Sequence, residues 1–227
     1  MLECPSFHGT VVLVPYRSPV SLSMASVETP WAWIKAARAI LQEEPRTQPS
    51  RMPVELLPWL FLSNLPAVIK YDNLQALGVT AVLTTNKIVK QEQLWSLTAA
   101  LAERDIRHGY AGGVDIVGYD MMKYHWDDAK TFLTEALEDP NPKIVIHCAA
   151  GTNRSALIAG ATMLTLDKEN NWTFLQVVRL LKERRGVVLN NVWFIRQLAE
   201  FAMQCDKLGT RPGDYTDEPL AASEMVF

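Results

Sequence analysis

Residues 143–155 read Lys-Ile-Val-Ile-His-Cys-Ala-Ala-Gly-Thr-Asn-Arg-Ser. The run from Lys143 to His147 is apolar and rich in β-branched residues, which predicts a buried strand. The small and apolar residues from Ser155 to Leu166 predict a buried helix. Backbone N–H groups of the small residues between them can converge on one point, where the helix N-terminus adds positive potential. The stretch therefore predicts an anion-binding loop, here called the cradle loop (residues 148–154).

The ends of the cradle loop carry the groups that phosphoryl chemistry needs. Cys148 opens it, and the pKa of a thiol falls beside a helix N-terminus and a cation, which favours the nucleophilic thiolate. Arg154 closes it and offers planar, bidentate donors to phosphate oxygens. We expect Ser155 to hydrogen-bond the sulfur and His147 to hydrogen-bond the loop backbone. The expected phosphate contacts are Ala149, Ala150, Gly151, Thr152, Asn153 and Arg154.

A single cysteine after a buried strand is more often an inert core residue. Here the cysteine, Gly151, Arg154 and Ser155 stand at fixed offsets between a predicted strand and a predicted helix. This combination favours nucleophilic catalysis over a purely structural role.

The composition of the chain limits the classes of protein to which it can belong. The chain has 227 residues, 48% of them hydrophobic and 21% charged, with a net charge of −3. These values are typical of a globular protein and do not suggest a nucleic-acid partner. The three cysteines lack metal-ligand spacing, and neither a signal peptide nor a membrane span is evident. We expect a cytoplasmic or nuclear protein with no metal, and the sequence does not determine its oligomeric state.

Residues 1–53 read as an N-terminal extension. A short strand is expected over 11–14, and Thr29-Pro30 is expected to cap and start an amphipathic helix that ends near Pro45. This helix is expected to pack on the outside of the main domain, with partner binding as the alternative. Residues 45–53 are expected to be a linker.

Strand and helix patterns alternate over 54–205, which predicts one α/β domain with a mainly parallel central sheet flanked by helices. Strands are expected at 59–62, 80–85, 106–110 and 143–148. Helices are expected at 66–77, 91–104, 120–137, 155–166, 172–185 and 191–205, with Asp120 and Asn171 as N-caps. The polar tail, 206–227, is expected to be disordered.

Thiolate attack needs an acid to protonate the leaving oxygen and a base to activate water afterwards. Asp115 is the favoured candidate because it follows a predicted strand in a glycine-rich loop, 111–119, that could move over the site. Asp120 is the alternative, although an N-cap role already explains it.

Residues 147–155 match the pattern His-Cys-x-x-Gly-x-x-Arg-Ser/Thr, which resembles the signature of the Cys-based protein tyrosine phosphatases, whose P-loop would be the cradle loop. Ser155 and the short chain resemble the dual-specificity branch. The segments at 58–64, 74–83, 182–185 and 191–198 are similar to other parts of that domain, with Asn191 as a supporting residue. The resemblance implies a phosphocysteine intermediate on Cys148, no cofactor, and an acid about 30 residues before the nucleophile, which favours Asp115.

The substrate is predicted less sharply than the chemistry. No Lys or Arg stands between Cys148 and Arg154, which favours a phosphoprotein carrying phosphotyrosine, phosphoserine or phosphothreonine over a phosphoinositide. Lys182, Arg184 and Arg185 either bind a second phosphate or form a solvated helix end. The alternatives are an RNA 5′-triphosphate, glucan or phosphoinositide phosphatase, a non-catalytic phosphate-binding scaffold, and a sulfur-transfer or arsenate-reducing enzyme.

Overall fold

A five-stranded sheet organises the computed structural model, which describes residues 29–44, 53–88 and 90–225. The strands are β1 (Val54–Leu57), β2 (Leu60–Asn64), β3 (Ala81–Asn86), β4 (Arg107–Gly113) and β5 (Ile144–Cys148), and they lie in the order β1-β2-β5-β3-β4. Only β1 pairs antiparallel, as a hairpin with β2. The central strand β5 lies parallel to β2 and β3, and all five of its residues are buried. The expected parallel sheet is confirmed, and Cys148 ends its central strand.

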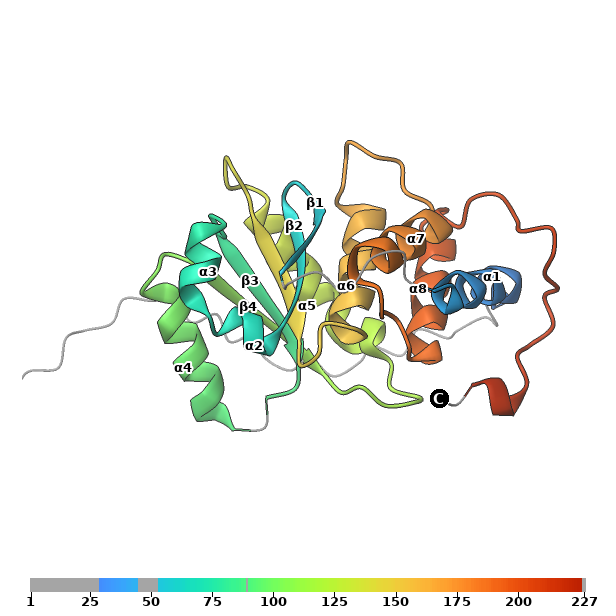
Figure 1. Cartoon of the computed structure of the whole chain (residues 1–227), viewed down its shortest axis with the longest axis horizontal. Helices are drawn as coiled ribbons and strands as arrows, with labels where there is room; N and C mark the ends of the chain where they lie inside the picture. The colour runs from blue at the N-terminus through green and yellow to red at the C-terminus, as the bar shows by residue number, and fades with distance from the viewer. Residues whose placement is uncertain (1–28, 45–52, 89, 226–227) are drawn as a thin grey trace, which may run out of the picture.

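Helices cover both faces of this sheet (Figure 1). The short α2 (Leu65–Val68) and α3 (Tyr71–Ala76) lie with α4 (Gln91–Ala102) on one side. On the other side lie α5 (Met121–Ala136), α6 (Arg154–Thr165), α7 (Phe174–Arg185) and α8 (Val192–Gln204). Successive side chains of β5 point to opposite faces of the sheet, which explains why helices cover both faces. Ile144 and Ile146 join the larger apolar cluster, while Val145 joins the smaller cluster under α3 and α4.

The N-terminal helix α1 (Trp31–Gln42) packs on α7 and α8. Its buried face is small and apolar and comprises Ala32, Ile34, Ala36, Ala37 and Ile40. Lys182, whose side chain is almost fully buried, donates from Nζ to the carbonyl oxygen of Leu41 at 2.7 Å, which satisfies one of the last carbonyls of α1. The expected packing of this helix on the outside of the domain is confirmed.

The segment after α8 also contacts α1. Leu220 is buried in the larger cluster, Lys35 Nζ donates to Thr216 Oγ1 at 2.9 Å, and Arg38 pairs with Glu224 at 3.5 Å. Glu224 lies in a short 3-10 helix, Ala222–Glu224. These contacts lie within the stretch 206–227 for which composition predicts disorder, and they hold Thr216 and Glu224 against α1.

Several local expectations are corrected. The strand β1 was not expected, and the helix expected over 66–77 is two helices, since residues 69–70 interrupt it. Thr29 does not cap α1; its Oγ1 donates to Glu200 Oε1 at 3.2 Å, and Pro30 precedes the first helical residue. Thr173, not Asn171, precedes α7, and its N–H donates to Gln176 Oε1 at 3.0 Å. The strand expected over 11–14 lies outside the described residues, as does most of the expected linker.

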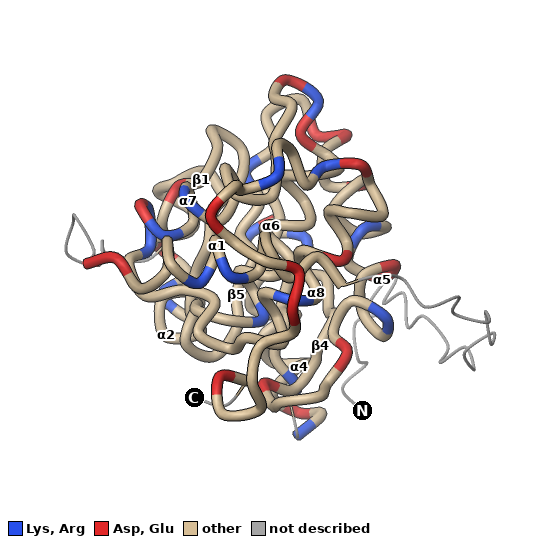
Figure 2. The backbone as a smooth tube through the Cα atoms, turned by 90° about the vertical axis from the view of Figure 1, so that its right-hand side faces the viewer, with Lys and Arg blue, Asp and Glu red and all other residues tan. Residues whose placement is uncertain are grey.

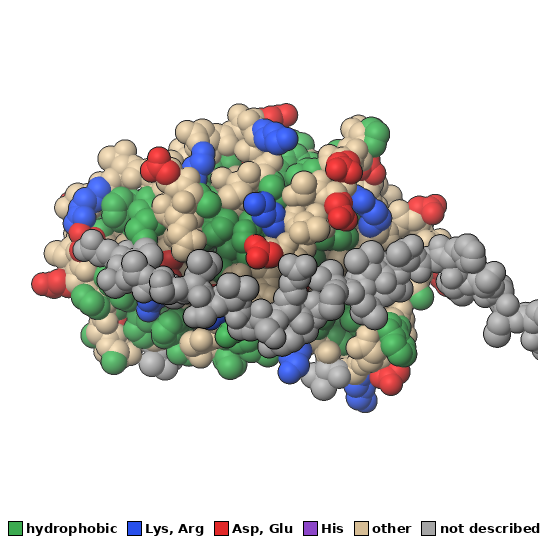
Figure 3. All heavy atoms as spheres, turned by 180° about the vertical axis from the view of Figure 1, so that it is seen from behind, with side chains coloured by type: hydrophobic (Ala, Val, Ile, Leu, Met, Phe, Trp, Pro, Cys, Tyr) green, Lys and Arg blue, Asp and Glu red, His purple; other side chains and the backbone are tan. Residues whose placement is uncertain are grey.

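Basic and acidic residues are interspersed over the side that carries α1, α7 and α8 (Figure 2). The opposite side of the molecule from Figure 1 likewise mixes apolar and charged side chains (Figure 3). Within the described ranges, no helix has the length and apolar character needed to cross a bilayer.

Candidate active site

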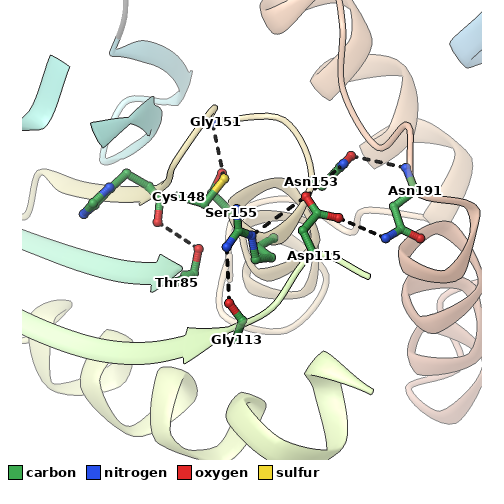
Figure 4. Close-up of polar contacts among 10 residues, drawn as sticks. Thr85, Gly113, Asp115, Cys148, Gly151, Asn153, Ser155 and Asn191 are labelled. Atoms are coloured by element: carbon green, nitrogen blue, oxygen red, sulfur yellow. Dashed lines mark hydrogen bonds and ion pairs between the residues drawn. The ribbon is translucent and has the colours of Figure 1, made fainter. Parts of the chain in front are cut away.

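The cradle loop connects the carboxyl end of β5 to the first residue of α6. Gly151 has φ of +68°, a left-handed conformation that glycine adopts without a Cβ penalty, and this lets the chain turn sharply. Two groups donate to the buried sulfur of Cys148, the backbone N–H of Gly151 and the hydroxyl of Ser155, each at 3.2 Å (Figure 4). The expected hydrogen bond between Ser155 and the sulfur is present.

This environment lowers the pKa of the Cys148 thiol. Burial alone raises the pKa of this thiol, but hydrogen bonds from the Ser155 hydroxyl and from backbone N–H groups outweigh burial, together with the positive charge of Arg154. The lowered pKa increases the fraction of Cys148 that is thiolate near neutral pH, which is the form that attacks an electrophile.

Four consecutive carbonyl groups of the cradle loop are bonded on the side away from the sulfur. Leu65 N–H donates to Ala149 O at 3.3 Å, and Leu189 N–H donates to Thr152 O at 2.8 Å. Arg185 holds the two carbonyls between them, from Nη2 to Ala150 O at 3.2 Å and from Nε to Gly151 O at 3.1 Å. Because a peptide N–H points opposite to its carbonyl, these outward bonds leave the N–H groups free to converge on an anion.

The carboxylate of Asp115 lies across the loop from the sulfur and is held by two amides (Figure 4). Asn153 Nδ2 donates to Oδ2 at 3.1 Å, and Asn191 Nδ2 donates to Oδ1 at 2.9 Å. Arg154 Nε lies 3.8 Å from Oδ2, while its Nη1 donates to Gly113 O at 3.2 Å. The fold therefore brings together the candidate nucleophile, the candidate arginine and the candidate acid.

Asp120 does not reach this network. Its side chain accepts from Lys123 N–H at 2.9 Å and caps α5, as the sequence predicts.

A second polar chain ends at His147, directly before the candidate nucleophile. Thr98 Oγ1 donates to Leu94 O at 2.9 Å, so it accepts from His108 Nδ1 at 2.8 Å. His108 Nε2 then accepts from Thr84 Oγ1 at 2.8 Å, and Thr84 in turn accepts from His147 Nε2 at 2.7 Å. This order of donors assigns the hydrogen of the neutral His147 ring to Nε2.

Both imidazoles of this chain stay neutral at physiological pH. Burial lowers the pKa of His108 to about 4. Burial, with a contribution from His108, lowers the pKa of His147 to about 3. The His147 ring is hydrogen-bonded to Thr84, and a hydrogen bond with the backbone of Cys148, the first residue of the cradle loop, acts to raise its pKa against these effects. The backbone carbonyl of His147 accepts from Thr85 Oγ1 at 2.8 Å.

Comparison with known proteins places this geometry in a family. The model of the dual specificity phosphatase catalytic domain matches residues 60–204, well over half of the chain. The chain belongs to the dual-specificity phosphatase family. This confirms the resemblance drawn from residues 147–155.

Curated relatives of this family are distant. Rat dual specificity protein phosphatase 26 is 30% identical over 145 residues, which cover 63% of this chain and 64% of that protein. Human dual specificity protein phosphatase 4 is 26% identical over 158 residues, or 67% of this chain and 35% of that protein. The chain thus matches less than two thirds of the length of either relative.

Solved structures support the fold. Human DUSP28 superposes with a TM-score of 0.57 at 18% identity, covering 70% of this chain and 99% of that one. DUSP15 superposes with a TM-score of 0.54 at 22% identity, covering 68% and 90% of the two chains.

Sequence reasoning missed three features of this phosphatase domain. Arg185 holds the cradle loop and Lys182 caps α1, two intramolecular roles that the basic run does not predict. The side-chain amide of Asn153, a residue that is expected as a phosphate contact, donates to Asp115. The hydrogen bonds of Thr84 could not be predicted from the sequence, because a threonine in a buried strand gives the same pattern whether or not it bonds a histidine. No group of three or more His, Cys, Asp and Glu residues within the described ranges could hold a metal ion.

Proposed function

We propose that this chain is a Cys-dependent protein phosphatase that hydrolyses phosphotyrosine and phosphoserine or phosphothreonine. The observation that carries the proposal is the Cys148 thiol of lowered pKa, which faces inward N–H groups and lies near Arg154 and Asp115. Family membership supports the same activity.

In the first step, the Cys148 thiolate attacks phosphorus and an S–P bond forms while the bond to the leaving oxygen breaks. The N–H groups of residues 149–154 and the Arg154 guanidinium neutralise the charge on the three remaining oxygens. Asp115, as the carboxylic acid, gives its proton to the departing oxygen. Ser155 stabilises the sulfur through its hydrogen bond.

In the second step, water attacks the phosphocysteine and the S–P bond breaks. The Asp115 carboxylate takes a proton from that water, which restores the acid, and inorganic phosphate leaves with the thiolate regenerated. Asn153 and Asn191 act as positioning residues because each donates to one oxygen of this carboxylate.

The substrate class rests on the cradle loop and on the family. The loop side chains between Cys148 and Arg154 are neutral, so binding depends on one guanidinium and on backbone N–H groups, which suits a single phosphoryl group on a protein. Relatives are named as dual specificity protein phosphatases. A reducing compartment such as the cytoplasm or nucleus would keep Cys148 as a free thiol.

Turnover of p-nitrophenyl phosphate and of phosphotyrosine and phosphothreonine peptides tests the proposal. We expect Cys148→Ser to abolish turnover and Asp115→Asn to lower kcat by about 100-fold or more. Asp120→Asn is the matched control, because asparagine also caps helices, and it should retain wild-type rates.

Full activity of Cys148→Ser would refute the proposed nucleophile. Loss of activity in Asp120→Asn but not in Asp115→Asn would refute the proposed acid. Binding of phosphopeptides without any turnover would indicate a scaffold, and turnover confined to inositol lipids, RNA 5′-triphosphate or phosphoglucan would overturn the substrate class.

A further inference from the structure

Three segments border the cradle loop, and each is tied to it by a hydrogen bond. The start of α2 is tied through Leu65 N–H and Ala149 O, and the connection from α7 to α8 is tied through Leu189 N–H and Thr152 O. The loop from β4 to α5 is tied through Asn153 and Asp115. The carboxyl ends of β3, β4 and β5 meet at one edge of the sheet, where these loops gather (Figure 1). A substrate that places its phosphoryl group in the cradle loop must pass between these segments.

Each bordering segment exposes large aliphatic side chains. Ile116 and Val117 are 58% and 48% exposed, Val187 is 47% exposed, and Ile69 is 53% exposed. Here we call these four the rim residues. They account for four of the seven large hydrophobic side chains that are exposed among the described residues. Single exposed apolar side chains are ordinary, but a concentration of them around one site indicates an interaction surface.

The local backbone does not require these aliphatic residues. Ile116 O accepts from Tyr119 N–H at 3.3 Å, and Gly118 has φ of +81°, so residues 116–119 form a tight turn with glycine at its third position. Asp, Asn, Ser and Pro are the residues that favour such turns, whereas β-branched side chains do not. Val187 likewise follows Gly186, which ends α7. The choice of isoleucine and valine therefore needs a reason beyond the turn, and contact with a ligand supplies one.

We propose that the rim residues bind aliphatic side chains that flank the phosphorylated residue of a protein substrate. The proposal rests on the proposed phosphatase activity and adds a substrate preference to it. Ile116 and Val117 directly follow Asp115, which must approach the leaving oxygen, so residues beside the phosphoresidue come within reach of this turn. Val187 precedes Leu189 by two residues and Ile69 follows Leu65 by four, and the N–H groups of Leu189 and Leu65 bond the cradle loop.

A membrane surface is the competing partner for apolar loops beside a phosphate site. Surfaces that dock on anionic lipids combine apolar side chains with clustered Lys and Arg. Residues 115–119 read Asp-Ile-Val-Gly-Tyr, with one acid and no cation. Lys70 follows Ile69, and Arg184 and Arg185 precede Gly186, but the guanidinium of Arg185 is held by two carbonyls of the cradle loop. The whole chain has a net charge of −3. The rim thus suits an apolar peptide better than an anionic bilayer.

The test compares kcat/KM for three phosphotyrosine peptides that differ only in the residues beside the phosphotyrosine: Val and Ile, Ser and Gly, or Asp and Glu. We expect the aliphatic peptide to exceed the Ser/Gly peptide by about tenfold or more, which is the effect of placing one or two such side chains in an apolar site. Ile116→Ser and Val187→Ser should each reduce that preference at least about threefold. Turnover of p-nitrophenyl phosphate, which has no flanking residues, should be unchanged in both variants.

Trp95→Ser is the matched control, because Trp95 is 59% exposed but lies on α4, outside the three bordering segments. Equal kcat/KM for the aliphatic and Ser/Gly peptides, or a preference that survives both rim substitutions, would overturn the inference while p-nitrophenyl phosphate turnover still upheld the phosphatase. Faster turnover of a phosphoinositide in anionic vesicles, lost in Ile116→Ser, would assign the rim to membranes. Failure to turn over any of these substrates would refute the proposed activity itself.

Discussion

Arg185→Ala tests whether the outward bonds of the cradle loop create its phosphate site. The guanidinium of Arg185 donates to the carbonyl oxygens of Ala150 and Gly151 at 3.2 and 3.1 Å. The flanking carbonyls of Ala149 and Thr152 are held by backbone N–H groups that the substitution leaves in place. Alanine at 185 therefore releases only the middle of the loop, where the N–H groups of Gly151 and Thr152 follow the two released carbonyls.

The size of the effect can be estimated from these contacts. A hydrogen bond from a charged donor contributes about 1.5–3 kcal/mol net when it is shielded from water. Arg185 is half-buried, so water can replace part of each bond, and we take about 1 kcal/mol for each. Together the two bonds stabilise the phosphate-binding conformation of the cradle loop by about 2 kcal/mol. Loss of this free energy in the transition state corresponds to a roughly 30-fold lower kcat/KM.

The assay is steady-state turnover of p-nitrophenyl phosphate with parallel measurement of inhibition by inorganic phosphate. Both kcat/KM and the affinity for phosphate should fall. Arg185→Lys should recover only part of the loss, because an ammonium lacks the planar, two-pronged geometry with which the guanidinium binds both carbonyls. Arg179→Ala is the control on the same helix, since Arg179 pairs with Glu43 at the surface. Unchanged p-nitrophenyl phosphate kinetics with a defect confined to doubly phosphorylated peptides would refute this reasoning and return Arg185 to second-phosphate binding.

Three further predictions concern the sulfur, the acid and the histidine chain. Ser155→Ala removes a donor to the Cys148 sulfur and should raise the pKa of that thiol, measured as the midpoint of iodoacetamide inactivation against pH; an unmoved midpoint would contradict the role. Asn191→Ala should lower kcat about tenfold through loss of one hydrogen bond to the candidate acid, with the exposed Asn190→Ala as control, and equal rates in the two variants would count against it. Burial lowers the folded-state pKa of His108 to about 4, so its neutral ring contributes stability that is present above about pH 6.5 and lost as pH falls towards 4. His108→Asn should therefore reduce the fall in unfolding free energy between pH 7 and pH 5 by about 2 kcal/mol in urea titrations, and an equal fall in both proteins would contradict it.

The centre of the candidate site could be predicted from the sequence because its parts are local. Strand, turn and helix follow one another over residues 143–166, and each is encoded by apolar runs and small residues within that segment. The backbone alone then places Cys148 at a strand end and Arg154 at a helix start. The fold class was equally accessible, since period-2 and period-3.6 patterns alternate along the chain. The short β1 and the interruption after α2 were not predicted, because four-residue elements carry too few positions to establish a period, and β4 extends to Gly113, beyond the predicted strand.

The prediction of Asp115 depended on a chemical requirement, supported by the spacing that the family resemblance implies. The reaction needs an acid, and the sequence offered two carboxylates near the end of one strand. Asp120 could be set aside because helix capping already accounted for it, and the structure shows that hydrogen bond. The two amides that hold Asp115 come from the cradle loop and from the start of α8, so no local pattern could link them to it. The partners of an acid are fixed by how loops meet, which a single sequence does not display.

The basic run at the end of α7 marks the limit of sequence reasoning most clearly. Lys182 and Arg185 suit the negative end of a helix dipole, so their presence is explained before any tertiary contact is considered. In the fold, Lys182 points to the last turn of α1 and Arg185 points to the cradle loop. One helix thus joins the N-terminal helix to the phosphate site through two cations three residues apart. Weakening α1 should consequently disturb the cradle loop through α7, a connection that neither segment reveals by itself.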